Sequence, residues 1–512
     1  RAMLSGGKPA DRSPLAEGVV EQDGEVVLAR TARPERDPVL ALRAAAAAAQ
    51  AGLPLSPHAV RRLAATARPL PTPWPAEARE QLVTLLGSGR TTVDVWEALE
   101  AEGVITRLLP DWERVRCRPQ RNAVHVWTVD RHLIETAVRA SELTRRVGRP
   151  DLLLVAALLH DIGKGWPGDH SVTGETIARD VAGRIGFDRA DAAVLAGLVR
   201  HHLLLVDTAT RRDLDDPATV RAVADAVGTQ GTLELLHALT EADALATGPA
   251  AWSSWRGSLV AELVQRVSAV LAGDVPDDPG TAAAPTAEQE RLAVEAWRTG
   301  GPVLALRPRP EEPLGEPSGE PEPLGVELLI AVPDQPGVLP SVAGLLAVHR
   351  LTVRTAELRA LELPDGVDDG AVLLLNWRVA AEYGSLPQAA RLRADLVRAL
   401  DGSLDTAGRL AERDAAYPRR RGVVAPPPRV TVAPAASRHA TVIEVRAQDA
   451  PGLLFRIGRA LEDAKVRVRS AHVSTLGANA VDAFYVTGPA GDPLPEEEAA
   501  SVARRLEETL RA

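Results

Sequence analysis

The sequence predicts a multidomain α+β protein, in which an all-α domain is followed by two small β-α-β-containing modules. Two observations lead to this fold class. Residues 121–273 hold a sustained set of amphipathic helical patterns and carry most of the histidines. The C-terminal part of the chain contains an internal repeat. The chain has 512 residues, which is enough for about three or four domains with separate cores.

The first 120 residues favour mostly helical structure. A short strand is expected at Gly24–Leu28 and an Ala-rich helix at Ala41–Gly52. A run of prolines at positions 69, 71, 73 and 75 separates this helix from the next helical pattern.

The internal repeat has a constant offset, since Asp334 and Asp449 are 115 positions apart and the residues around them align without a gap. Each copy has a strand, an Asp-x-Pro-Gly turn, a helical stretch and a second strand. The two modules are expected at 323–405 and 437–512. Residues 274–322 and 406–436 are predicted to be linkers, because they are rich in Pro, Gly, Glu or Ala.

The composition excludes several classes of protein. A net charge of −10 argues against binding to nucleic acid or to an anionic membrane through a basic surface. Cys117 is the single cysteine, which excludes an intrachain disulfide framework and indicates a reducing compartment. The longest apolar run ends at Leu159 and is too short to span a bilayer. We therefore expect a cytoplasmic protein whose partners include neither DNA nor a membrane.

The pair His160-Asp161 is the centre of the predicted functional site. It follows the apolar segment Leu152–Leu159, so it ends a buried helix. Asp243 shares a helix face with apolar residues, and a buried carboxylate is costly unless it is paired or binds a metal. The predicted metal ligands are His132, His160, Asp161, His170, His201, His202 and Asp243. Of these, His170, His201 and His202 could instead contact the substrate.

Imidazole and carboxylate ligands suit a borderline divalent metal. We expect Mn²⁺ or Mg²⁺, with iron or zinc as alternatives. Such an ion lowers the pKa of bound water and neutralises charge on a phosphoryl oxygen, which are the requirements of phosphate-ester hydrolysis. His160, Asp161 and Lys164 are the predicted catalytic residues. Arg211 and Arg212 could bind a substrate phosphate, or they could be solvated surface residues.

The order His132, His160-Asp161, Asp243 resembles the HD phosphohydrolase superfamily. Within it, the chain most resembles the bifunctional PII uridylyltransferase/uridylyl-removing enzymes. The motifs that carry this resemblance are Asn122–His132, His160–Gly165, Gly168–Ser171, Arg200–Leu203, Thr210–Asp213 and Trp252–Trp255. The two Asp-x-Pro-Gly repeats resemble the tandem ACT domains of that family.

The resemblance implies an HD domain at 121–273, followed by two ferredoxin-like βαββαβ ACT domains. It also implies removal of UMP or AMP from a tyrosine of the nucleotidylated signalling protein PII, under the control of glutamine. Glutamine would bind at the turns that contain Asp334, Gly337, Asp449 and Gly452. The alternative is that each Asp simply caps the following helix.

The family's transferase site is a Gly-rich loop followed by paired aspartates, and the sequence shows no such pair. Residues 1–120 are therefore expected to be a mostly helical remnant that follows a missing nucleotidyltransferase domain. Two other functions stay open: a non-catalytic module that binds glutamine or PII, and an HD hydrolase for a different phosphate ester.

Overall fold

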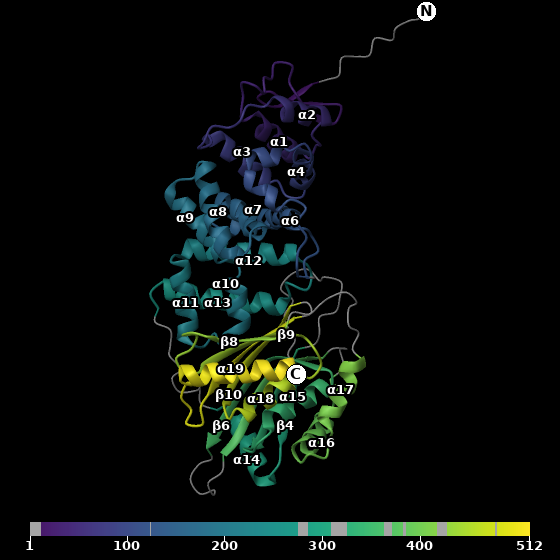
Figure 1. Ribbon diagram of the computed structural model, residues 1–512, viewed down its shortest axis with the longest axis vertical. Coiled ribbons are helices and arrows are strands. Elements are labelled where there is room, and N and C mark those ends of the chain that lie inside the picture. Colours follow the sequence, from purple (N-terminus) through teal and green to yellow (C-terminus); the bar gives the residue numbers. More distant parts are fainter. Residues whose placement is uncertain are drawn as a thin grey trace, which may run out of the picture. The chain divides into compact units, whose positions relative to one another are not determined.

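The computed structural model describes residues 12–122, 124–274, 285–308, 325–362, 371–381, 386–416, 427–476 and 479–512. Two compact units account for the chain. The first contains residues 1–205 and 224–252, and the second contains residues 206–223 and 253–512. The first unit is mainly helical and the second is built on a large sheet, so the predicted α+β class is confirmed (Figure 1).

The first unit begins with a small antiparallel sheet of three strands. Its strands are β1 (Ser13–Ala16), β2 (Val19–Gln22) and β3 (Glu25–Leu28). The Ala-rich helix is α1 (Leu40–Ala51), and Gly52 ends it in the left-handed conformation at φ 66°. The strand β3 and the helix α1 agree with the strand and the Ala-rich helix predicted from the sequence. The helices that follow are α2 (Pro57–Thr66), α3 (Ala76–Leu86), α4 (Thr91–Ala101), α5 (Val104–Leu108) and the 3₁₀ turn η1 (Pro110–Arg114).

The rest of the first unit is a helical bundle around a buried central helix, α7 (Pro150–Leu159). Every residue of α7 from Leu152 to Leu159 is buried, which explains why the segment lacks polar positions. The surrounding elements are α6 (Val129–Glu142), η2 (Thr144–Arg146), η3 (Ile162–Gly165), α8 (His170–Arg184), α9 (Arg189–Arg200) and α12 (Gln230–Thr247).

Two helices connect the units. The helix α10 (Leu204–Arg211) begins in the first unit and continues into the second, and α11 (Pro217–Val227) returns to the first. Among the described residues, Arg189–Arg211 is long and apolar enough to be considered as a membrane span. A turn at residues 201–203 divides this stretch into α9 and α10, so neither helix alone has that length.

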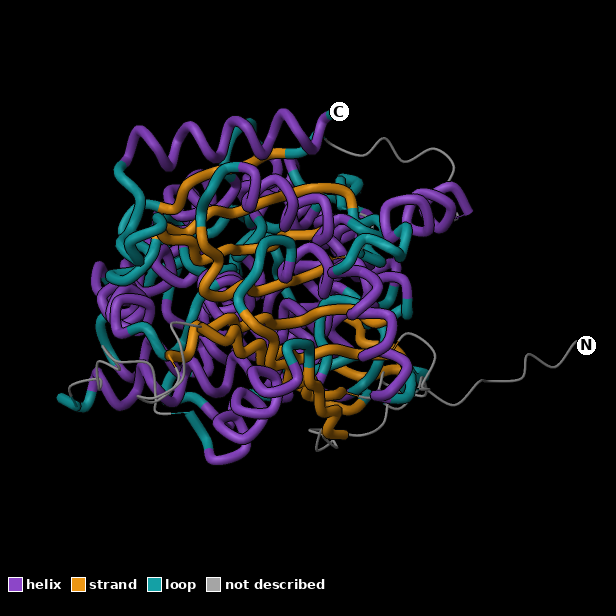
Figure 2. The backbone as a smooth tube through the Cα atoms, turned by 90° about the horizontal axis from the view of Figure 1, so that it is seen from below, coloured by secondary structure: helices purple, strands orange, loops and turns teal. Residues whose placement is uncertain are grey.

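The second unit contains an eight-stranded antiparallel sheet in the order β4-β5-β7-β6-β10-β11-β9-β8. The strands are orange in Figure 2. Its strands are β4 (Val303–Pro308), β5 (Gly325–Pro333), β6 (Leu351–Glu362), β7 (Ala371–Ala381), β8 (Arg429–Ala433), β9 (Thr441–Gln448), β10 (Arg467–Leu476) and β11 (Asn479–Thr487). The two repeats meet at β6 and β10, where Thr355–Glu357 pair with Ser470–His472.

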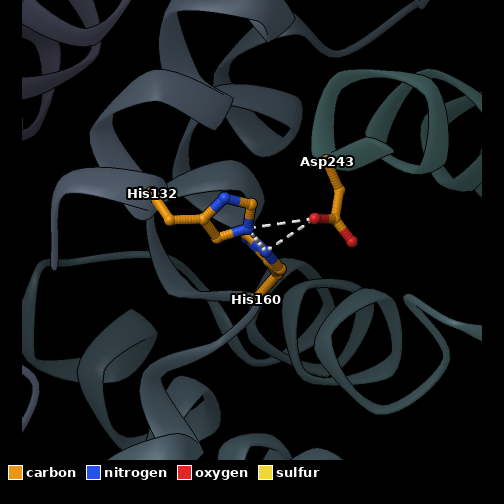
Figure 3. Close-up of side chains that lie close together, drawn as sticks. All are labelled: His132, His160 and Asp243. Atoms are coloured by element: carbon orange, nitrogen blue, oxygen red, sulfur yellow. Dashed lines mark hydrogen bonds and ion pairs between the residues drawn. The ribbon is translucent and has the colours of Figure 1, made fainter. Parts of the chain in front are cut away.

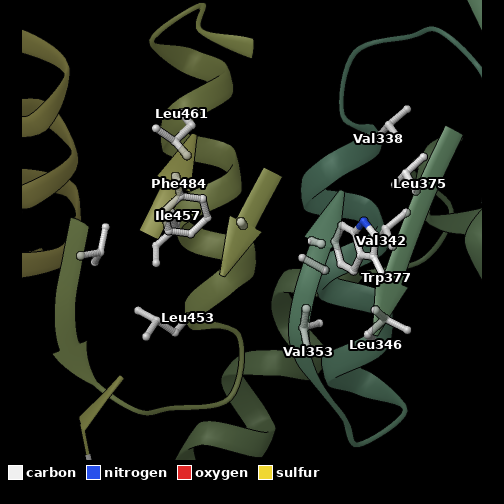
Figure 4. Packing of buried hydrophobic residues seen from close by; sticks show 14 of the residues in the cluster. Val338, Val342, Leu346, Val353, Leu375, Trp377, Leu453, Ile457, Leu461 and Phe484 are labelled. Atoms are coloured by element: carbon white, nitrogen blue, oxygen red, sulfur yellow. The ribbon is translucent and has the colours of Figure 1, made fainter. Parts of the chain in front are cut away.

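The repeat is visible in the helices that cover one face of this sheet. The helix α15 (Val338–Val348) and the helix α18 (Leu453–Asp463) have bounds that differ by 115 at both ends. Trp377 lies in the core under α15, and Phe484 occupies the core under α18 (Figure 4). The remaining helices are α13 (Ser254–Leu271), α14 (Ala287–Thr299), α16 (Ala389–Leu400), α17 (Thr406–Ala416) and α19 (Glu496–Arg511).

Three details correct the predicted organisation. The predicted linker 274–322 contains α14 and β4, and the predicted linker 406–436 contains α17 and β8. The edge strands β4 and β8 come directly before β5 and β9 in the chain. Each repeat therefore runs β-β-α-β-β-α instead of βαββαβ. Residues 206–223 and 253–273, predicted as part of the HD domain, belong to the second unit.

Candidate metal centre

Three side chains from three helices meet in the interior of the first unit (Figure 3). His132 lies on α6, His160 follows α7, and Asp243 lies on α12. The His132 Nε2 atom is 3.1 Å from His160 Nε2 and 3.0 Å from Asp243 Oδ1. The His160 Nε2 atom is 3.4 Å from Asp243 Oδ1. The two imidazoles are fully buried, so this group offers three ligand atoms in a water-poor environment.

A second group shares the same region of the bundle and consists of Asp161, His170 and His202. The Asp161 Oδ1 atom is 3.5 Å from the Nε2 atoms of both His170 and His202. Its Oδ2 atom is 3.5 Å from His160 Nε2 and 3.7 Å from His132 Nε2. Asp161 is therefore the side chain that connects the two groups.

Backbone carbonyls hold two of the imidazoles in a ligand-ready orientation. His160 Nδ1 donates to the Ala157 carbonyl at 2.8 Å, and His202 Nδ1 donates to the Val199 carbonyl at 2.7 Å. With the proton on Nδ1, the Nε2 lone pair points into the site, which is the arrangement that metal-binding histidines commonly show.

The charges of the site are unusual for a protein interior. Burial opposes the ionisation of Asp161, but Lys164 and the adjacent imidazoles outweigh it and hold the pKa of its carboxyl well below the usual range. Burial likewise opposes the ionisation of Asp243, and His160 and His132 keep its pKa well below the usual range. Lys164 Nζ lies 2.6 Å from Asp161 Oδ2. Both carboxyl groups are thus ionised at neutral pH.

Gly163 and Gly165 allow the loop after Asp161 to pass close to α8 and to η1. A Cβ atom on Gly163 would overlap the His170 carbonyl oxygen, and a Cβ atom on Gly165 would lie 2.6 Å from Arg114 Cβ. Asp169 then begins α8, because its carboxylate accepts hydrogen bonds from Ser171 N and Val172 N. The tight contact at Gly163 and this cap together place His170 beside Asp161.

His201 and two arginines are not brought into these groups. His202 is buried and joins the second group, whereas the adjacent His201 is only half-buried and belongs to neither. Arg211 pairs with Asp207 at 2.9 Å, and Arg212 pairs with Glu444 at 2.7 Å within the second unit. Each guanidinium group therefore already has a carboxylate partner.

Two polar residues near the site were not among the predicted ones. The His125 ring lies 5.2 Å from that of His132, and burial, with Lys164 and His132 nearby, lowers the pKa of His125 to about 4. Gln120 accepts a hydrogen bond from Lys164 at 3.0 Å. His125 falls inside the motif Asn122–His132, and this motif could have indicated that it lies near the site. Gln120 belongs to no motif, so nothing in the sequence indicated its position.

The two Asp-x-Pro-Gly turns lie in the second unit. Gly337 and Gly452 take φ values of 85° and 83° and are themselves the N-cap residues of α15 and α18. The aspartates therefore do not occupy the N-cap position of either helix.

Comparisons with known proteins agree with this arrangement. An HD domain model matches residues 129–247, and an ACT domain model matches residues 441–504. A bifunctional uridylyltransferase/uridylyl-removing enzyme of Streptomyces coelicolor is 81% identical over 100% of this chain and 64% of its own length. A protein of the same name from Mycobacterium tuberculosis is 43% identical over 94% of this chain and 58% of its own length. One from Gluconobacter oxydans is 34% identical over 81% of this chain and 48% of its own length.

The HD match contains both buried histidine–aspartate groups, and the ACT match contains β9, α18, β10 and β11 of the second repeat. The chain spans less than two thirds of the length of these relatives. The chain belongs to the family of bifunctional uridylyltransferase/uridylyl-removing enzymes.

Proposed function

We propose that this chain removes a nucleotidyl group, UMP or AMP, from a tyrosine of the signalling protein PII by metal-dependent hydrolysis in the cytoplasm. The observation that carries the proposal is the pair of ligand groups joined by the buried carboxylate of Asp161. The name shared by the relatives, uridylyl-removing enzyme, supports the reaction class.

The residues present fit a divalent cation. Asp161 Oδ1 is buried without a hydrogen-bond partner, although it faces two imidazole Nε2 atoms. An orphaned anionic oxygen in the interior is costly unless it binds a cation. Nitrogen and oxygen donors together suit Mn²⁺ or Mg²⁺, with iron or zinc as the alternatives. His132, His160 and Asp243 would form one half of the ligand set, and Asp161, His170 and His202 the other half.

When bound, a divalent metal lowers the pKa of a coordinated water and neutralises charge on a phosphoryl oxygen. The chain's own residues supply the rest. Lys164, held between Asp161 and Gln120, keeps the Asp161 carboxylate ionised and oriented. In the reaction, a water oxygen bonds to phosphorus, the bond from phosphorus to the tyrosine oxygen breaks, and that oxygen takes up a proton. The nucleoside monophosphate and unmodified PII are the products.

We propose further that glutamine controls this reaction by binding to the sheet unit. The match to an ACT domain model and the two glycine turns at Gly337 and Gly452 support this part. Each turn begins a helix, and a helix start favours a ligand carboxylate through its backbone N–H groups.

The experiment compares Asp161→Asn with a matched control, His237→Asn. His237 lies on α12 with Asp243 but belongs to neither ligand group. Metal content is measured by mass spectrometry, and release of UMP or AMP is measured from uridylylated and adenylylated PII. We expect Asp161→Asn to lose metal and at least a hundredfold in rate, while His237→Asn keeps both.

Full hydrolysis by the Asp161→Asn protein would contradict the proposed site. Release of phosphate from free nucleotides, with none from modified PII, would favour a hydrolase for a different phosphate ester. The wild-type protein could also bind no metal and show no hydrolytic activity, even with added Mn²⁺ or Mg²⁺. That result would favour a regulatory module.

A further inference from the structure

An exposed indole, that of Trp166, lies at the edge of the metal centre. Trp166 follows η3, close after Lys164, and its backbone N–H donates to the Gly163 carbonyl at 3.0 Å. The Arg114 guanidinium carbon lies 3.5 Å from the centroid of the indole ring, so a cation covers one face of the ring. Trp166 is nevertheless 38% exposed. The rest of its ring is therefore open to a ligand.

The indole is held in place by its neighbours. Gly165 has no Cβ atom, and one built there would lie 2.6 Å from Arg114 Cβ, so η3 packs directly on η1. Trp112 of η1 and Val115, which follows η1, are buried, and they anchor Arg114 between them. An aromatic face that is already fixed loses little conformational entropy when a flat ligand stacks on it.

The segment between η1 and α6 is fastened on two sides of the metal centre. Cys117 N donates to Asp130 Oδ2 at 2.8 Å, which ties the segment to the first turn of α6. Val126 N donates to the Thr247 carbonyl at 3.2 Å, and the Thr247 hydroxyl lies 3.3 Å from Asp243 Oδ1. The segment is therefore tied to two of the helices that carry the proposed metal ligands.

Two polar atoms of this segment are buried and have no hydrogen-bond partner among the residues that the structure describes. One is Gln120 Nε2, which belongs to the amide whose Oε1 atom accepts from Lys164 at 3.0 Å. The other is Nδ1 of His125, whose ring lies 5.2 Å from that of His132. A buried polar atom without a partner costs free energy. A polar ligand bound at this edge of the metal centre would satisfy such atoms.

The start of the segment is strongly basic, although the chain as a whole carries a net charge of −10. Its positive residues, with no acidic residue among them, are Arg114, Arg116, Arg118 and Arg121. Arg116 pairs with Glu100, whereas Arg114 and Arg121 are exposed. Positive charge concentrated beside the proposed metal centre attracts an anionic group such as the phosphate of a nucleotide.

An open aromatic face, an unused amide donor and local positive charge thus lie together. A nucleotide matches all three, because its base is flat and bears hydrogen-bond acceptors, and its phosphate is anionic. The ring of a tyrosine side chain matches only the aromatic face. The combination therefore favours the nucleotide over the tyrosine as the occupant.

We propose that Trp166 is the stacking platform for the base of the nucleotidyl group, and that Gln120 Nε2 donates a hydrogen bond to the same nucleotide. The proposal rests on the proposed function, which puts the phosphoryl group at the metal centre. The turn η3 separates Trp166 from Asp161, and at about 2 Å per residue of 3₁₀ helix this is a path of about 10 Å, which one nucleotide can bridge. Every base has a flat π face, so uracil and adenine both stack on this platform.

The platform is tested by calorimetry of the full chain, supplied with Mn²⁺, with AMP, UMP and ribose 5-phosphate as ligands. Trp166→Ala should weaken the binding of AMP and of UMP at least tenfold, because it removes the stacking face. Ribose 5-phosphate has no base, so its affinity should stay within about twofold of wild type. Trp166→Phe keeps an aromatic face and should restore most of the affinity for both nucleotides. An equal loss for all three ligands, or unchanged affinity for AMP and UMP, would overturn the proposal.

The matched control is Val172→Ala. Val172 is exposed, as Trp166 is, and it lies on α8 close after His170. The helical period turns it about 200° away from His170, so it faces away from the metal centre. Its replacement should leave all three affinities within about twofold of wild type. If Val172→Ala lost as much nucleotide affinity as Trp166→Ala, the loss would not report stacking, and the assignment of Trp166 would fail.

Hydrolysis of modified PII gives a second readout. Trp166→Ala should raise KM at least tenfold for both uridylylated and adenylylated PII and leave kcat within about threefold, because stacking of the base is the same in the ground state and the transition state. A raised KM together with unchanged affinity for AMP and UMP would put the tyrosine or another part of PII on the indole and contradict the base platform. If wild type hydrolyses no modified PII, the proposed function fails, and the comparison of AMP and UMP with ribose 5-phosphate still decides the platform.

Discussion

The buried carboxyl group of Asp482 should make the second unit less stable as the pH rises. Asp482 lies on β11 opposite Val445, and the corresponding position of the first repeat is Leu375, opposite Ile330. An acid therefore stands where the other repeat has a core leucine. Burial and the nearby Asp449 raise the pKa of Asp482 to about 8, although Ser474 N donates a hydrogen bond to it at 3.4 Å.

The sign follows from proton binding. Between pH 3.8 and about 8, the folded chain keeps a proton that the unfolded chain releases. The free energy of unfolding therefore falls as the pH rises through this window. Each pH unit in this window lowers the free energy of unfolding by about 1.4 kcal/mol. Relative to its value below pH 3.8, the free energy of unfolding is lower by about 4 kcal/mol at pH 7 and by about 1.6 kcal/mol at pH 5.

Asp482→Asn removes the titrating group and keeps a side chain of similar shape. Compared with wild type, we expect its unfolding transition to be higher by roughly 8 °C or more at pH 7 and by only a few degrees at pH 5. Scanning calorimetry of the full chain at pH 5, 7 and 8.5 measures this difference. Asp492→Asn, at an exposed position of the same unit, is the control. A difference that stays constant or shrinks with rising pH would refute the reasoning.

Three further outcomes are expected. Gly163→Ala should lower metal affinity at least tenfold, measured by competition with a chelator, because its Cβ atom would displace the His170 backbone. Glu135→Gln should cost about 2 kcal/mol in urea unfolding, because the buried carboxylate would lose its ionic contacts with Arg90 and Arg131. Removal of metal by a chelator should lower the unfolding temperature of wild type, since a ligand of the folded state stabilises it.

The repeats were predictable because their signal is local and occurs twice. A strand, a glycine turn and a helical stretch recur at a constant offset of 115 residues, and the bounds of α15 and α18 keep this offset. The elements inside the predicted linkers have weak signals. Only Thr406 and Leu410 are fully buried in α17, and β8 has five residues, so neither shows a long apolar period. The elements α17 and β8 are stabilised by packing against the repeats, and no local sequence pattern indicates such packing.

Most residues of the two histidine–aspartate groups could be singled out from the sequence, but the sequence did not show which of two adjacent histidines joins them. His201 and His202 follow α9 directly, and only His202 reaches Asp161. Adjacent residues at a helix end point in directions about 100° apart, so at most one of them faces a given site. Sequence spacing alone does not fix which one, because the exact end of a helix is uncertain by one or two residues.

The outer face of the sheet explains how two similar repeats acquire different neighbours. Leu329 of β5 packs in the apolar cluster under α14. Its counterpart in β9 at the offset of 115 is Glu444, which pairs with Arg212 of the segment matched by the HD domain model. An apolar residue at this register attracts an apolar helix face, whereas a carboxylate needs a cationic partner. A single outward-facing position in each repeat thus helps decide that α14 covers the first repeat and that the segment between His202 and Asp243 lies on the second.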